Sequence, residues 1–129
     1  MTTGPTPALM ADINAAFNSR DVERIMTFFT DDATFLMARG PEADGRRVHG
    51  KAAIKKILAD RFQVIRDMRW DHVDAFIMGD RAVSVWMVTG TGADGEKLHY
   101  RGCDIYRFRG DKILHKDTYW KLVEHRERL

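Results

Sequence analysis

The sequence predicts an α+β fold, in which N-terminal helices pack against a single antiparallel sheet formed by the rest of the chain. Two patterns support this class. Apolar residues recur at helical spacing up to about residue 65, and they alternate with polar residues from residue 70 onward. A long curved sheet whose concave face is covered only by helices makes a cone, so we expect a pocket inside it.

Three helices are expected in the first half of the chain. The first begins at about residue 8 and has Phe17 on its apolar face. Asp21 is placed to cap the second helix, because its carboxylate can accept hydrogen bonds from the free amides of the first turn. This second helix is expected to bury Phe29 and to end at residues 30–32. The third helix begins at Gly50.

Strands are expected where short apolar runs or a period of two occur. The glycine- and proline-containing region 38–49 is expected to be a loop. Residues 79–80 and 110–111 are two-residue hairpin signals, and residues 90–95 form a longer glycine-rich loop. The expected strands are 33–37, 70–78, 81–89, 97–109 and 112–123.

Composition excludes several classes of protein. The net charge of +2 is far below that of a dedicated nucleic-acid binder. Cys103 is the only cysteine, so no internal disulfide can form, and no His/Cys spacing resembles a zinc site. No apolar run approaches the length of a membrane span, and no signal peptide is evident. We therefore expect a soluble, cytoplasmic protein without a metal, a nucleic-acid partner or a membrane partner.

Three segments together resemble a known family. They are residues 19–34 (SRDVERIMTFFTDDAT), 48–54 (VHGKAAI) and 102–120 (GCDIYRFRGDKILHKDTYW). The chain resembles the nuclear transport factor 2-like superfamily, and within it the SnoaL-like polyketide cyclases and the ketosteroid isomerases. The resemblance implies one SnoaL-like domain over residues 1–129 with a frayed segment 1–6. It also implies a cone-shaped, cystatin-like or ketosteroid isomerase-like roll.

The resemblance does not carry over a known active site. The aspartate of the isomerases' Asp-x-x-Arg-Phe strand falls on Asp104, but their catalytic base falls on Met37 and their oxyanion tyrosine on about Ile13. A thioether and an alkyl chain can neither accept a substrate proton nor donate to an oxyanion. The related epoxide hydrolases use two carboxylates that fall on Val83 and Thr118. Neither mechanism is therefore expected in its known form.

Asp104 is the central candidate, because a carboxylate within an apolar strand is costly to bury unpaired. Facing a pocket, it would act in acid/base chemistry; as a buried structural group, it would pair with Lys116 or Arg101. A two-residue turn at 110–111 places Asp104 opposite Asp117. The family resemblance instead turns the Lys116 side of the last strand toward the pocket, which requires a β-bulge. Both registers remain open at this point.

The candidate site has two parts. The candidate catalytic residues are Asp104, Asp117 and His49. His49 is included because it borders the expected pocket and could act as a base near neutral pH. His72 and His99 are expected to be structural, since no ligand partner lies at metal spacing. The expected ligand-binding residues line the pocket wall: Ile13, Phe17, Met37, Phe62, Val83, Val85, Tyr106, Lys116, Thr118 and Trp120.

Two functional classes follow from these candidates. The first is a cofactor-independent isomerase, cyclase or lyase that moves a proton on an apolar, ring-bearing or ketone-like small molecule. The second is a non-catalytic ligand-binding or scaffolding module of the same fold, which the methionine at the isomerase base position favours. A homodimer is expected through the outer sheet face, where Trp86 and Tyr119 would expose apolar area.

Overall fold

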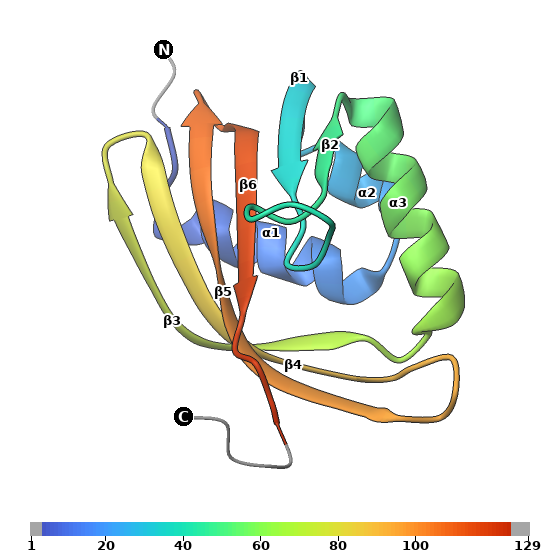
Figure 1. Cartoon of the computed structure of the whole chain (residues 1–129). Helices are drawn as coiled ribbons and strands as arrows, with labels where there is room; N and C mark the ends of the chain where they lie inside the picture. The colour runs from blue at the N-terminus through green and yellow to red at the C-terminus, as the bar shows by residue number, and fades with distance from the viewer. Residues whose placement is uncertain (1–3, 125–129) are drawn as a thin grey trace.

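The computed structural model describes residues 4–124 and shows helices packed on one side of a curved, open sheet (Figure 1). The sheet has six strands in the order β2-β1-β6-β5-β4-β3. The elements in chain order are α1 (Pro7–Ser19), α2 (Val22–Met26), β1 (Phe29–Leu36), β2 (Arg47–His49), α3 (Lys51–Val64), β3 (Arg69–Met78), β4 (Arg81–Thr91), β5 (Lys97–Arg109) and β6 (Lys112–Trp120).

The sheet is mixed, whereas the sequence predicted an antiparallel one. Strands β3 to β6 form the expected meander of hairpins, but β1 lies parallel to β6. Two parallel strands must be joined by a long connection. Between β1 and β6, this connection contains α3 and the strands β3, β4 and β5. The predicted loop 38–49 also contains β2, which pairs with β1 in antiparallel register.

The beginning of the chain departs from prediction at two places. Thr6 accepts a hydrogen bond from the Leu9 amide as the N-cap of α1, so the predicted frayed segment does not extend to it; residues 1–3 lie outside the described part of the chain. Asp21 caps α2 as predicted. That helix ends earlier than expected, because Phe29 pairs with Ile113 of β6 and so begins β1.

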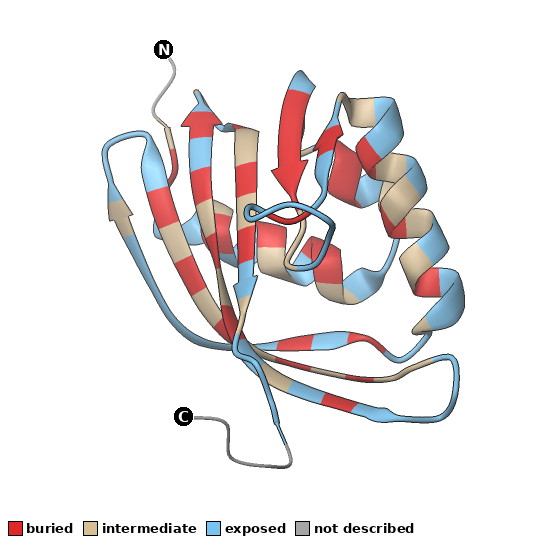
Figure 2. Cartoon of the chain, viewed as in Figure 1, coloured by how far each residue is buried: buried red, intermediate tan, exposed pale blue. Residues whose placement is uncertain are grey.

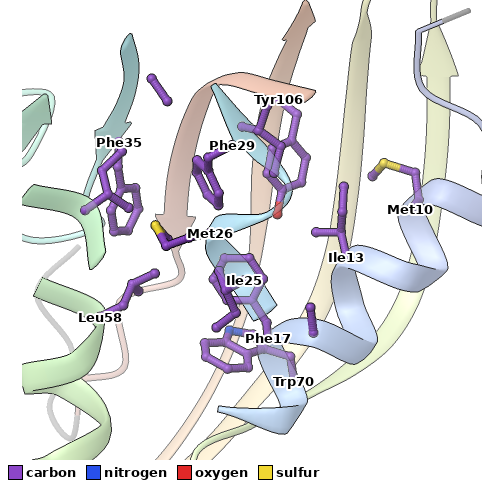
Figure 3. Packing of buried hydrophobic residues seen from close by; sticks show 14 of the residues in the cluster. Met10, Ile13, Phe17, Ile25, Met26, Phe29, Phe35, Leu58, Trp70 and Tyr106 are labelled. Carbon is purple, nitrogen blue, oxygen red and sulfur yellow. The ribbon is translucent and has the colours of Figure 1, made fainter. Parts of the chain in front are cut away.

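The hydrophobic core lies between the helices and the concave face of the sheet (Figure 2). Figure 3 shows the side chains of α1, including Ile13 and Phe17, facing Tyr106 of β5 and Trp70 of β3. The Phe17 ring meets the Trp70 ring edge-on at a centroid distance of 5.7 Å. Alternation on β4 places Trp86 in this core at 2% exposure, so the expectation that Trp86 is exposed on the outer face is wrong.

Two β-bulges change which side chains face the core. In β6, His115 pairs with Arg107 and Ile113 with Phe108, which makes Leu114 the extra residue. In β3, His72 pairs with Trp86 and Asp74 with Val85, which makes Val73 the extra residue. An extra residue reverses the facing of the side chains that follow it. The bulges thus determine which polar groups reach the interior.

Candidate functional site

Asp104 lies on the inner face of β5 and is 5% exposed. Its Oδ1 accepts hydrogen bonds from Lys116 Nζ at 2.7 Å and from Thr118 Oγ1. Its Oδ2 accepts from Trp86 Nε1 at 2.9 Å and from the Tyr106 hydroxyl at 3.4 Å. These four donors occupy both carboxylate oxygens of Asp104.

Lys116 is the cation that pairs with Asp104, and it is 6% exposed. The bulge at Leu114 places Lys116 opposite Tyr106 and Thr118 opposite Asp104, so the bulged register is correct and the register that paired Asp104 with Asp117 is wrong. The ammonium also lies 4.5 Å from the centroid of the Phe35 ring. Burial lowers the pKa of Lys116, while the charge of Asp104 opposes that decrease.

An internal cavity of about 20 Å³ adjoins this pair. Such a volume holds about one water molecule, whereas small-molecule sites usually measure roughly 300–1,000 Å³. A ligand larger than water therefore needs neighbouring side chains to move. The cavity wall consists of Met10, Ile13, Asn14, Phe17, Trp70, His72, Ser84, Trp86, Asp104, Tyr106 and Lys116.

Several predicted pocket residues lie elsewhere. Val83 and Val85 are on the outer face of β4, because Ala82, Ser84 and Trp86 take the inward positions; their predicted place in the pocket wall is wrong. Four other predicted lining residues do not reach the cavity wall. They are Met37, Phe62, which meets Trp70 edge-on, Trp120, which stacks on Tyr100, and Thr118, which donates a hydrogen bond to Asp104.

The structure does not bring the three predicted catalytic residues together. Asp117 is on the outer face, where it accepts a hydrogen bond from the Tyr119 hydroxyl at 3.1 Å. His49 is exposed, and its Nδ1 lies 2.9 Å from Thr34 Oγ1. Both are separated from Asp104 by the sheet, because the bulge and the strand alternation direct them outward.

His72 lies at the candidate site, although the sequence analysis predicted a purely structural role for it. It lies on the cavity wall, and its Nε2 is 2.8 Å from Ser84 Oγ. Burial lowers the pKa of His72, and the nearby charge of Asp104 partly opposes this effect. Strand alternation from Trp70 could have indicated its inward position, but nothing in the sequence marked the bulge at Val73 or the proximity to Asp104.

The described residues 4–124 contain no group of three His, Cys, Asp or Glu side chains that could hold a metal ion. Within the same residues, no helix is long and apolar enough to cross a membrane. What the cluster offers chemically is a buried ion pair, the hydroxyl of Tyr106 and a neutral imidazole around one small space. Burial raises the pKa of Tyr106 well above its usual value, so this hydroxyl keeps its proton.

Solved structures resemble this fold closely. A protein of ketosteroid isomerase-like fold from Catenulispora acidiphila, in complex with trimethylamine, has a TM-score of 0.78 at 20% identity, covering 92% of this chain and 88% of that one. A cystatin-fold protein from Novosphingobium aromaticivorans has a TM-score of 0.73 at 26% identity, covering 86% and 94%. A candidate polyketide cyclase from Xanthomonas campestris has a TM-score of 0.76 at 21% identity, covering 88% of each chain.

No curated protein matches the chain in sequence. The SnoaL-like domain family, in contrast, matches residues 10–116, which include most of α1, the whole meander up to Lys116 and every residue of the cavity wall. The curved sheet behind N-terminal helices is also the architecture of the solved relatives. The chain therefore belongs to the SnoaL-like domain family.

Proposed function

We propose that this protein binds a small neutral molecule with an apolar ring body and one carbonyl or hydroxyl oxygen, and that it moves a proton on that molecule. The reaction would be that of a cofactor-independent isomerase, cyclase or lyase. Membership of the SnoaL-like family and the resemblance to a candidate polyketide cyclase support this class. Fold alone does not select a reaction, whereas the side chains of the site limit which reactions are chemically feasible.

The observation that carries the proposal is the buried Asp104–Lys116 pair at the wall of a cavity between α1 and the sheet. An ion pair buried in this way is often no more stabilising than apolar residues of equal volume. Lys116 donates two of its three N–H groups to Asp104 and Thr118. The third N–H is the donor that we assign to the ligand oxygen, since the side chain lines the cavity.

Each member of the cluster then has a distinct role. Lys116 would hold, through its third N–H group, an oxygen on which negative charge develops, which is the usual way to favour an enolate-like transition state. The lowered pKa of Lys116 makes its ammonium a better proton donor. Both oxygens of Asp104 already accept hydrogen bonds. Asp104 would therefore hold Lys116 in place and favour its charged form, rather than remove a proton from the ligand itself.

The non-catalytic alternative is favoured by one observation, the small volume of the cavity. In that case the ion pair is a structural element, and the family fold serves as a binding or scaffolding module without turnover. The two classes differ in a measurable way, because only an enzyme accelerates proton transfer to and from the bound molecule.

A bicyclic ketone, 1-tetralone, and its oxygen-free analogue tetralin test the proposal. Quenching of Trp70 and Trp86 fluorescence reports binding, since both indoles line the cavity. We expect 1-tetralone to bind at least tenfold more tightly than tetralin, about the value of one hydrogen bond to a charged group. The paired variant Asp104→Asn/Lys116→Met should lose this preference, and the exposed control Lys112→Met should keep it.

Turnover is measured on the same ketone. In D2O, an enzyme of this class should exchange the hydrogens on the carbon beside the carbonyl faster than buffer does, as followed by NMR. Equal binding of tetralone and tetralin would contradict the proposed site. Preferential binding of tetralone without exchange would favour the non-catalytic module.

A further inference from the structure

His72 marks the boundary between two hollows. On one side is the internal cavity with Asp104 and Lys116. On the other is a surface groove of about 330 Å³ between the start of α1 and β3, a volume within the usual range for small-molecule sites. Met10 and His72 line both hollows. The groove is lined by Pro7, Met10, Ala11, His72, Ala75, Phe76 and Ile77, so His72 is its one ionisable side chain among the residues that the structure describes.

Met10 separates the groove from the cavity. Its side chain is 3% exposed. Figure 3 shows Met10 on α1, one turn before Ile13. Methionine is unbranched and changes rotamer easily, so its side chain can move without a change in the backbone of α1. With Met10 displaced, the apolar groove and the polar cavity become one continuous space that passes His72.

The orientation of His72 is fixed locally. The bulge at Val73 directly follows it, and bulges commonly redirect a side chain beside a functional site. The Ser84 hydroxyl holds Nε2 at 2.8 Å. In the tautomer that carries its proton on Nε2, the lone pair of Nδ1 is the acceptor. The lowered pKa of His72 keeps this ring neutral at pH 7, the form that a base requires.

We propose that the apolar body of the ligand occupies the α1–β3 groove and that His72 is the base that removes a proton from the carbon beside the ligand's carbonyl group. This inference rests on the function proposed above and assigns its missing base. In the step, the C–H bond breaks and an N–H bond forms on His72. The electron pair moves through the new C=C bond to the carbonyl oxygen, which Lys116 holds. Return of the proton from His72 to carbon completes the cycle without an oxidant or reductant.

Solvent-deuterium exchange into 1-tetralone tests the role of His72. His72→Gln keeps a donor and an acceptor for Ser84 but cannot carry a proton. We expect exchange to fall on the order of a hundredfold, the usual value of a general base, while tetralone affinity changes little. His99→Gln, at an exposed position on β5, is the matched control and should exchange like the wild type. In His72→Ala, added imidazole should restore part of the rate.

The groove is tested separately. Ala75→Phe should fill it and weaken tetralone binding about tenfold, whereas Ala93→Phe, in the exposed turn after β4, should not. If tetralone binds and exchanges equally in the wild type and His72→Gln, His72 is not the base, although the proposed function stands. If the wild type neither prefers tetralone nor exchanges it, the proposed function fails and this inference fails with it. Unchanged affinity in Ala75→Phe overturns the groove as the binding place.

Discussion

Replacing Asp104 with asparagine leaves Lys116 buried without its counter-charge. Asparagine keeps the shape of aspartate, but an NH2 group replaces one of the two carboxylate oxygens. That group cannot accept the hydrogen bond that Trp86 or Lys116 donates to the oxygen in the wild type. Breaking a buried ion pair by removing one partner costs about 3–5 kcal/mol. Asp104 and Lys116 are both more than nine-tenths buried, so solvent does little to reduce this cost. We expect Asp104→Asn to lose about 3–5 kcal/mol in free energy of unfolding at pH 7.

The pH dependence of this loss identifies its cause. Burial already lowers the pKa of Lys116 from 10.5, and Asp104 opposes the decrease, so the variant lowers it further. Between the folded-state pKa and 10.5, the unfolded chain binds more protons than the folded chain, and stability rises with pH. The slope is at most about 1.4 kcal/mol per pH unit for one group. The deficit of the variant should therefore shrink as pH increases from 7 toward 10.

Urea unfolding followed by tryptophan fluorescence at pH 6, 7, 8 and 9 measures both effects. The double variant Asp104→Asn/Lys116→Met removes the unpaired charge and should regain most of the lost stability, roughly 2–4 kcal/mol. A stability change below about 1 kcal/mol in Asp104→Asn, at the level of an exposed pair, would mean that Lys116 does not depend on Asp104 as its buried counter-charge. A deficit that does not vary with pH would show that Lys116 is not the group left unpaired.

Three further outcomes are expected. Gly102→Ala should lose about 1–3 kcal/mol in urea unfolding and shift the tryptophan emission, because the added Cβ would lie 2.7 Å from the Trp86 ring. Asn18→Ala should lose roughly 1–3 kcal/mol in the same assay, because Asn18 exchanges two hydrogen bonds of 2.8 Å with the backbone of Trp70 and ties α1 to β3; an unchanged midpoint would contradict this. Sedimentation equilibrium should show a homodimer through the outer sheet face at micromolar concentration, and Tyr119→Glu should shift it toward monomer, since this exposed ring lies on that face.

Periodicity predicted the elements of the fold well, and its failures have local causes. The change of period after residue 65 separated α3 from the meander, and the hairpin turns set the strand boundaries. Phe29 was assigned to a helix because apolar spacing continues through α2, yet its pairing with Ile113 overrides that local preference. The parallel contact of β1 with β6 depends on a crossover that no local pattern records.

The site was harder to predict because it depends on two bulges. Asp104 was identified from its cost of burial in an apolar strand, and its pairing with Lys116 was one of the alternatives left open. Choosing between Lys116 and Asp117 required the extra residue at Leu114, which no residue pattern marks and which only the family resemblance implied. The position of His72 beside the site was also missed, because no residue pattern marks the bulge at Val73. The errors at Val83 and Val85 have another cause. Ser84 pairs with Asp104 and faces the same side of the sheet, so its chain neighbours Val83 and Val85 must face the opposite, outer side.

The most direct test of the proposed site is a crystal structure of the protein soaked with 1-tetralone. We expect that Met10 moves aside, that the rings occupy the groove between α1 and β3, and that the ketone oxygen lies about 3 Å from Lys116 Nζ, at hydrogen-bond distance. A ketone oxygen directed to solvent, or a ligand bound elsewhere with the cavity beside Asp104 still closed, would rule out this binding mode.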